Sequence, residues 1–365
     1  MAKRSTRAQV RQQLREASDA GRDVLTEVRR WQRVEINLFR MVAGGLALAL
    51  PIAVGLATGR IEAGMVAALG ALLVSGSGHA GPLRSRIGEL LVTCVVGLAG
   101  TWLGLELGGG SGWSSLMIVA LGVLAVVVGA LRPSAAKASV QFIVFMIIGA
   151  NLAQAPIPSW IVVGYMALGT VLGGALTLLA YGTESLIRDR PGAVRPPRRS
   201  WRTDLQDWRR RMGTLAGWHY PLRLGSCMLA AEIVAHVAPG EHSYWILLTV
   251  VLVVQRDHDA ALTRTAQRGI GTAAGVVLGA FLLNSVPVWV TLAVVGLVGA
   301  VRGYLKAANY AAYTLVMTPL VTVLSGLGHP VSSSLLRERL VDTVIGCLIS
   351  LLIGYFMWRR VRWTE

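Results

Sequence analysis

Long apolar runs, separated by short polar connections, divide the chain into segments of roughly membrane length. The runs of the first half are 41–58, 63–78, 88–107, 114–131, 138–153 and 159–181, and those of the second are 222–238, 244–255, 269–283, 286–301, 309–326 and 340–358. Because about twenty apolar residues cross roughly 30 Å of hydrocarbon, the pattern predicts an all-α polytopic membrane protein of about twelve transmembrane helices. The run 244–255 is short for a full crossing, so a broken or re-entrant element is the alternative there.

The distribution of Lys and Arg predicts the orientation of these spans. With the N-terminus inside, the outward loops 59–62, 108–113, 154–158, 239–243, 284–285 and 327–339 contain only Arg60, Arg337 and Arg339 of the 35 basic residues. Cytoplasmic loops carry an excess of Lys and Arg. Both termini are therefore expected on the cytoplasmic side of a bacterial inner membrane.

Composition agrees with a protein dissolved in lipid. Hydrophobic residues make up 54% of the chain and charged residues 15%, well below the quarter that is usual for soluble domains. The net charge is +16. The basic residues that produce it lie between apolar runs and in terminal segments, so they indicate membrane topology and contact with anionic lipids rather than a nucleic-acid partner.

Two basic segments stand outside the spans. The chain is predicted to consist of a cytoplasmic amphipathic helix over 1–38, a first membrane repeat over 39–181, a basic linker over 182–221, a second repeat over 222–358 and a tail over 359–365. Within the linker, the stretch around Leu205, Trp208 and Met212 has the period of an amphipathic helix on the membrane surface. We expect no cleavable leader, because a basic stretch precedes the first apolar run.

The two halves repeat one another. A shift of about 182 residues places Arg40 on Arg223 and Arg86 on Arg268, and a slightly smaller shift places Arg132 and Lys137 on Arg302 and Lys306. Six is an even number of spans, so the repeats are expected to be parallel and related by a pseudo-two-fold axis along the membrane normal. The matched basic residues would then form a ring that selects anions, or they are plain topology anchors.

A motif in the second half resembles a known family. It consists of Tyr244-Trp245-Ile-Leu-Leu-Thr249, Gln255-Arg256-Asp-His-Asp and Arg264-Thr-Ala-Gln-Arg268-Gly-Ile-Gly271-Thr272-Ala-Ala-Gly275. This stretch is similar to the fusaric acid resistance-like (FUSC) family, which includes aromatic acid exporters and is distantly similar to plant malate channels. The first half is degenerate, with Glu89 and Leu90 where the second has Gly271 and Thr272. The resemblance implies a membrane protein that exports aromatic acids.

Candidate anion-binding residues follow from the repeat and the motif. Arg264 and Arg268 lie one helical turn apart and face the same way, as a grip on a carboxylate requires. The candidates for substrate binding are Arg223, Arg264, Arg268, Arg302, Lys306, Arg40, Arg86, Arg132, Lys137, Tyr244 and Trp245. Gln141, Asn151 and Asn309 are possible polar positions along the passage.

Three further patterns have two interpretations each. Glu232 and His236, at i and i+4, form either a proton-coupling pair or a structural pair near a helix end. Tyr244 and Trp245 either belong to an aromatic belt at the outer interface or stack on an aromatic substrate. Gly271, Gly275 and Gly279 form a small-residue face that allows close helix packing.

The sequence therefore favours a secondary transporter that exports small organic anions, with aromatic acids as the narrower substrate hypothesis and proton coupling as the hypothesis for its energy source. An anion channel and a non-transporting scaffold for cell-envelope enzymes are the alternatives. No phosphate loop or metal-ligand spacing is present, so we expect no enzymatic activity, cofactor or metal, whereas a homodimer is possible.

Overall fold

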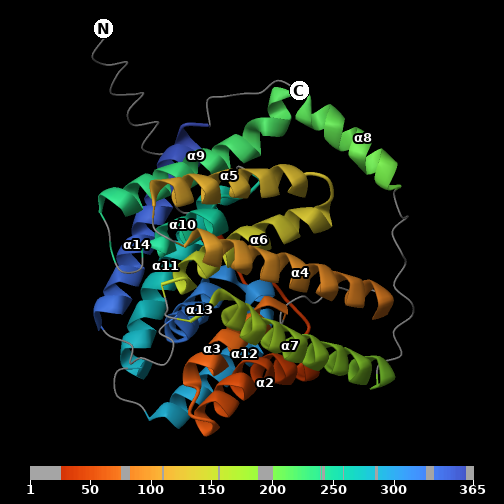
Figure 1. The fold of residues 1–365 in the computed structure, drawn as a ribbon, viewed down its shortest axis with the longest axis vertical. Coiled ribbons are helices and arrows are strands. Elements are labelled where there is room, and N and C mark those ends of the chain that lie inside the picture. The colour runs from red at the N-terminus through yellow and green to blue at the C-terminus, as the bar shows by residue number, and fades with distance from the viewer. Residues whose placement is uncertain are drawn as a thin grey trace.

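A computed structural model of the chain describes residues 26–74, 83–108, 111–154, 157–187, 200–238, 240, 243–257, 259–283, 287–325 and 333–358. Within these residues the regular structure is helical throughout (Figure 1). The first half contains α2 (Leu38–Ala57), α3 (Ile61–Val74), α4 (Leu83–Leu107), α5 (Gly112–Gly129), α6 (Pro133–Leu152) and α7 (Ser159–Ile187). After α8 (Trp201–Met212), the second half contains α9 (Leu215–Val237), α10 (Tyr244–Val253), α11 (Asp259–Leu283), α12 (Val288–Ala308), α13 (Tyr310–Ser325), α14 (Ser333–Leu351) and a π-helical turn, η1 (Leu352–Phe356).

Each predicted span overlaps a helix, although several bounds differ by up to ten residues, and the prediction of an all-α membrane protein is confirmed. Seven helical segments among the described residues are long and apolar enough to cross a membrane: those in α2, α4, α5, α6, α7 and α12, and α14 continued through η1. The helices α3, α10 and α13 are apolar but shorter.

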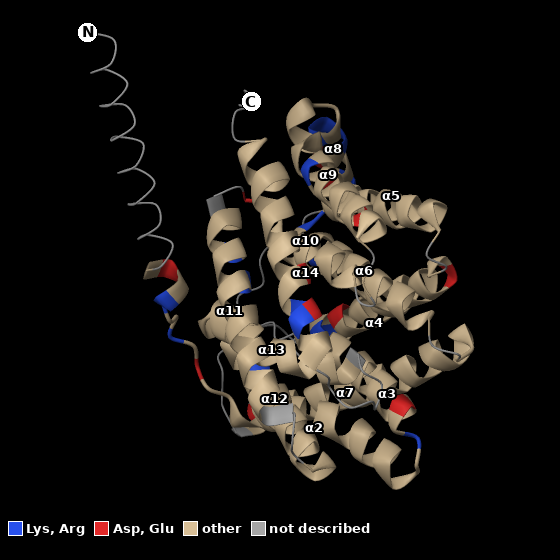
Figure 2. Cartoon of the chain, turned by 90° about the vertical axis from the view of Figure 1, so that its left-hand side faces the viewer, with Lys and Arg blue, Asp and Glu red and all other residues tan. Residues whose placement is uncertain are grey.

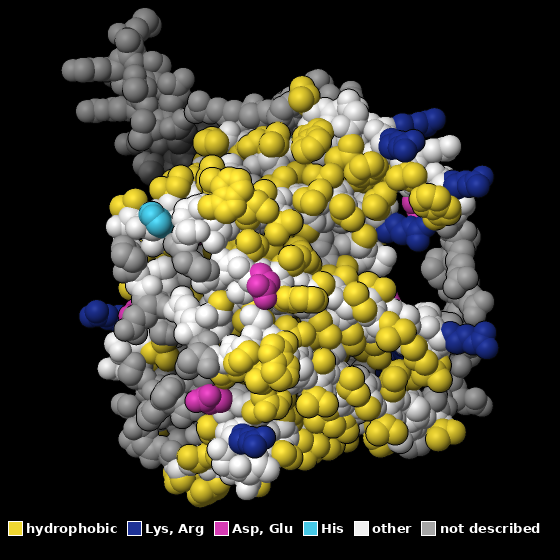
Figure 3. All heavy atoms as spheres, in the orientation of Figure 1, with side chains coloured by type: hydrophobic (Ala, Val, Ile, Leu, Met, Phe, Trp, Pro, Cys, Tyr) yellow, Lys and Arg dark blue, Asp and Glu magenta, His cyan; other side chains and the backbone are white. Residues whose placement is uncertain are grey.

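The surface has the polarity that lipid requires. Large apolar side chains are exposed over the face seen in Figure 3, whereas Lys and Arg gather mainly along one edge. Phe281 is 84% exposed and Val171 is 70% exposed. Water would oppose so much contiguous apolar surface, but lipid tails accommodate it.

Capping side chains fix where several helices begin. The Asn37 side chain accepts a hydrogen bond of 3.1 Å from the Arg40 amide, and Ser111 accepts one of 3.2 Å from the Ser114 amide. Pro133 occupies the first turn of α6, where its missing N–H costs nothing. The predicted amphipathic helix over 1–38 does not extend to residue 38, because residues 30–37 are not helical.

The segment before α2 is held by side-chain and backbone hydrogen bonds to the corner between α12 and α13. The Asn309 amide donates to the carbonyls of Val28 and Arg30, and the Gln32 amide donates to Ala308 O. These contacts fix Val28, Arg30 and Gln32, at the start of the non-helical stretch 30–37. Residues before 26, which carry most of the predicted helix, lie outside the described part.

Helix α8 is the amphipathic helix expected within the linker. None of its side chains is buried, and its Trp208 indole donates to Val127 O at the end of α5. Asp204 forms an ion pair with Arg132. These two contacts hold α8 against the end of α5 and the start of α6.

Packing within each half follows a matching order. In the first half α4 packs on α6, α3 on α7 and α2 on α3, and in the second half α11 packs on α13, α10 on α14 and α9 on α10. Between the halves α2 packs on α12 and α5 on α9, with smaller contacts of α6 with α10 and of α3 with α13. Glycines permit the close contact between α2 and α12, since a Cβ at Gly44 of α2 would lie 2.7 Å from Gly299 O of α12.

Candidate functional site

A cavity of about 760 Å³ lies between the two halves. Helices α3 and α6 of the first half and α10 to α14 of the second line most of it. Its apolar wall includes Val144, Phe145, Leu248, Met317 and Val321. A space of this size, mainly apolar with a few polar groups, is typical of a small-molecule site.

The charges that line the cavity are nearly all positive. Its basic residues are Lys137, Arg256, Arg264, Arg268, Arg302, Lys306 and Arg339. Among the described residues, Asp257 is the one carboxylate in the lining. Basic positions in the middle of the bundle are also visible in Figure 2. A concave site of one sign with low-dielectric walls attracts ions of the opposite sign, so this cavity is suited to an anion.

Five of the seven lining cations form two groups that differ in exposure, and the other two are the exposed Arg256 and the buried Arg302. Lys137 and Lys306 are exposed, and the half-buried Arg264 lies in electrostatic range of Lys306, with its guanidinium carbon 3.3 Å from the centre of the Tyr310 ring. We name Lys137, Arg264 and Lys306 the mouth cluster.

The second group is buried. Arg268 is 5% exposed and Arg339 2% exposed, and the two guanidiniums lie close enough to repel one another. The guanidinium carbon of Arg339 lies 4.6 Å from the ring centre of Trp245, which is fully buried. We name Arg268 and Arg339 the deep pair.

Helix α10 crosses only part of the bundle. Its ten residues span about 15 Å, and residues 254 and 255 continue without helical structure toward α11. The Arg223 guanidinium donates to Gln255 O, and the Tyr220 hydroxyl donates to Val254 O at 3.4 Å. Arg223 therefore places a positive charge beside the carbonyl end of a broken helix, where the helix dipole favours it.

The carbonyl end of the short helix α3 is satisfied in the same way. The Gln141 amide donates to Leu73 O at 3.0 Å, and the Arg302 guanidinium donates to Leu72 O at 3.3 Å. Since the last carbonyls of a helix have no partner within it, these two side chains from α6 and α12 supply donors. Arg302 thus both supports α3 and lines the cavity.

Six of the predicted site residues line the cavity: Lys137, Tyr244, Arg264, Arg268, Arg302 and Lys306. The polar candidates Gln141 and Asn151 line it too, whereas Asn309 holds the segment before α2. Arg223 supports α10 outside the lining, and Trp245 is buried beneath Arg339. Because Trp245 is fully buried, its assignment to an aromatic belt at the membrane surface is wrong.

The first-half arginines lie away from the cavity. Arg40 forms a 3.0 Å ion pair with the buried Glu184 of α7. The Arg86 guanidinium lies 3.3 Å above the Tyr181 ring, and Arg132 pairs with Asp204 of α8. The structure therefore does not bring Arg40, Arg86, Arg132 and Arg223 into one ring with the lining cations.

The predicted match of Arg132 and Lys137 with Arg302 and Lys306 is wrong in register. Arg302 and Lys306 lie inside α12, before the helix break at Asn309. Arg132 is instead the N-cap of α6, and Lys137 lies within that helix, after the break. Similar residue order on opposite sides of a helix break produced the apparent match.

Glu232 and His236 lie on α9, outside the cavity lining. Glu232 is half-buried and close to Ser115 of α5, and His236 is exposed. They share a helix face, as their spacing predicts, but neither points to the lining described above.

Two lining cations were not predicted as site residues. Arg256 follows α10, and Arg339 was placed in an outward loop over 327–339. Helix α14 begins at Ser333, so Arg339 is inside the helix and buried, whereas its neighbour Arg337 is exposed. The signal available in the sequence was the i, i+3 spacing of Leu336 and Arg339, which places both on the buried face.

Comparisons with known proteins agree on the second half. Residues 228–353 match the family model described as Fusaric acid resistance protein-like. The uncharacterized protein YhfK of Escherichia coli K12 is 30% identical over 145 residues, which cover 39% of this chain and 20% of YhfK. An uncharacterized protein of Haemophilus influenzae is 34% identical over 116 residues, covering 32% of this chain and 16% of that relative.

A third relative has a location in its name. The inner membrane protein YccS of E. coli K12 is 28% identical over 145 residues, covering 39% of this chain and 20% of YccS. The matched region thus spans about a fifth or less of these relatives. No solved structure matches the chain. The apolar helices and the similarity to YccS support an inner-membrane location.

Proposed function

We propose, from the premise that residues 228–353 form a fusaric acid resistance-like domain, that this protein carries small organic anions across the inner membrane. One observation carries the proposal: a cavity between the halves is lined by seven Lys and Arg residues and, among the described residues, by a single carboxylate. Lys137, Arg264, Arg268, Arg302 and Lys306 would hold the anion. Aromatic acids are the substrates that the family resemblance implies.

The proposed architecture is twelve crossing helices in two parallel six-helix repeats. The packing order supports it, because each main helix pair of the first half has a counterpart at the matching position of the second. The two main contacts between halves, α2 with α12 and α5 with α9, also exchange under a two-fold rotation. Both members of the matched pairs α3/α10 and α6/α13 line the cavity, as expected of a site near the axis.

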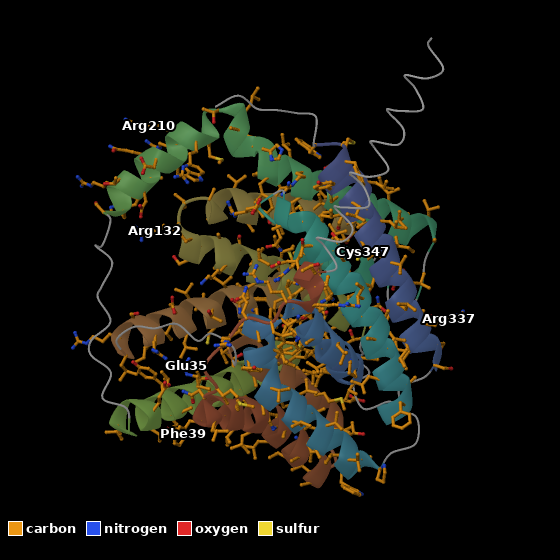
Figure 4. The ribbon with its side chains drawn as sticks, turned by 180° about the vertical axis from the view of Figure 1, so that it is seen from behind. Glu35, Phe39, Arg132, Arg210, Arg337 and Cys347 are labelled. Carbon is orange, nitrogen blue, oxygen red and sulfur yellow. The ribbon has the colours of Figure 1, made fainter. Side chains whose placement is uncertain are left out.

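The proposed orientation places both termini in the cytoplasm. In Figure 4, Phe39, Arg132 and Arg210 lie toward one edge of the molecule and Arg337 toward the opposite edge. The first edge contains the start of α2 and the basic helix α8. The positive-inside rule assigns that edge to the cytoplasm.

A carrier fits the cavity better than an open channel. Of the lining cations, Lys137 and Lys306 are exposed, whereas Arg268 and Arg339 are buried. A site placed between two repeats is the arrangement that alternating access uses. The proposal assigns no proton-coupling role to Glu232 and His236, because they lie outside the lining.

Reversing two lining charges tests the proposal. In proteoliposomes, the double variant Arg268→Glu/Arg302→Glu is expected to lower the flux of benzoate and 4-hydroxybenzoate at least about tenfold, because it replaces two buried cations with anions that repel the substrate. Lys306→Glu, at the exposed end, is expected to lower flux without adding a buried carboxylate.

Arg337→Glu is the matched control, since Arg337 is exposed and outside the lining. It should transport as the wild type does. Equal flux through the wild type, the double variant and Lys306→Glu would contradict the proposal. Currents far above carrier turnover in the same vesicles would instead indicate a channel.

A further inference from the structure

The two groups of cations lie at different depths of one cavity. Arg264 of the mouth cluster and Arg268 of the deep pair are four residues apart on α11, which corresponds to about 6 Å along the helix axis. Lys306 lies in electrostatic range of Arg264 and Lys137, and Arg268 lies in range of Arg339. The cavity therefore offers an anion two positions, one exposed and one buried.

The deep pair has donors without acceptors. The Nε and Nη1 atoms of Arg339 and the Nε atom of Arg268 are buried and have no hydrogen-bond partner among the described residues. A buried guanidinium with unpaired donors is costly, since the desolvation of each N–H is not offset. An acidic group of a ligand would supply the missing acceptors, because guanidinium and carboxylate geometries match.

The mouth cluster is cationic in its own right. Arg264 is stacked on Tyr310 and Lys306 is exposed, so an acidic group bound there would remain partly hydrated. The cavity wall is largely apolar, with Val144, Leu248 and Met317 among its residues. A compact, strongly hydrated anion would leave this apolar space unfilled, whereas a hydrocarbon or aromatic body would bury against it.

We propose that the ligand is an elongated dianion, with two acidic groups separated by an apolar spacer of about 6 Å or more, the rise of four helical residues. One acidic group binds the deep pair and the other binds the mouth cluster. This inference rests on the proposed function and deepens it. It names the charge and length of the substrate, and it assigns Arg339 a direct binding role.

Binding to the full chain in detergent tests the inference by a length series. The probes are succinate, adipate, suberate and sebacate, each compared by calorimetry at constant ionic strength with its own monomethyl ester. The ester keeps the same spacing between its two carbonyl carbons and has one charge fewer. We expect the preference of diacid over ester to be weak for succinate and to reach at least about tenfold, or 1.4 kcal/mol, at adipate or suberate.

Variants locate the second acidic group. Arg339→Leu should reduce the diacid preference to about one while the esters still bind at the mouth cluster, and Arg339→Lys should restore part of it. Arg337→Leu lies two residues away on the same helix and is exposed, so the length preference should be unchanged.

The outcomes are separable. If every diacid binds the wild type no better than its ester, the two-position inference is wrong, although a single-anion carrier remains. If Arg339→Leu folds and keeps the full preference, the deep pair is not a binding position. If none of the probes binds and no anion flux occurs in vesicles, the proposed function fails along with the inference.

Discussion

Replacing Gly271 with alanine is expected to destabilise the protein by about 3 kcal/mol, the upper end of the usual cost of overpacking. A Cβ at this position would clash with the hydroxyl of Thr314 and lie 2.5 Å from Ala311 O, both on α13. The carbonyl belongs to a helix backbone and cannot rotate away. Helices α11 and α13 would have to separate, although both help to line the cavity.

Gly269→Ala is the matched control on the same helix, because a Cβ there meets nothing within 4 Å. Alanine is a better helix former than glycine by about 1 kcal/mol, so this variant should be unchanged or slightly more stable. Thermal unfolding in detergent can be followed with a thiol-reactive dye, since Cys227 and Cys347 are buried. Equal melting temperatures for Gly271→Ala and Gly269→Ala would show that α11 and α13 do not pack this closely.

Trp245→Ala is expected to cost about 3 to 5 kcal/mol, the usual range for removing a buried Trp side chain. The side chain is fully buried on α10, and its ring lies beneath the Arg339 guanidinium. Removing it leaves a large void in a short helix whose other residues are mostly buried. It also removes a cation–π contact that helps to hold a buried charge.

Trp245→Phe keeps an aromatic ring beneath Arg339 and should lose less than half as much stability. The same thiol-dye measurement compares the three proteins. If Trp245→Ala and Trp245→Phe have the same melting temperature, the ring is not packed in the core. The aromatic-belt interpretation of Trp245 would then be restored.

The sequence was sufficient for the helices because runs of apolar residues determine them. The alternative of a broken element over 244–255 agrees with α10, which is ten residues long and is followed by non-helical residues. The small-residue face is confirmed for Gly271 and Gly275, where added Cβ atoms would clash with α13. The length of the apolar run and the i, i+4 spacing of the glycines were enough for these two predictions.

The site was harder to predict, because a basic residue in a membrane helix has several uses. Arg264 and Arg268 line the cavity, as their shared face predicted. Arg223, matched to Arg40 by the repeat, instead donates to the end of α10, and Arg40 pairs with Glu184. Neither carbonyl ends nor distant carboxylates can be located by periodicity, so sequence could not separate ligand-binding arginines from those that support the fold.

Arg339 shows a different difficulty. Its role depended on where α14 begins, and a start seven residues later would leave it in a loop. Helix boundaries are the least certain part of a prediction from a single sequence. The predicted start of α14 therefore determined whether Arg339 was assigned to an exposed loop or to the cavity.

Anomalous diffraction from crystals of the full chain soaked with 4-bromobenzoate tests the central claim most directly. If the cavity between the halves binds organic anions, the bromine signal will lie inside it, within reach of Arg268, Arg302 or Lys306. Bromine found solely among the exposed basic residues at the edge, with the cavity empty at saturating ligand, would contradict the account.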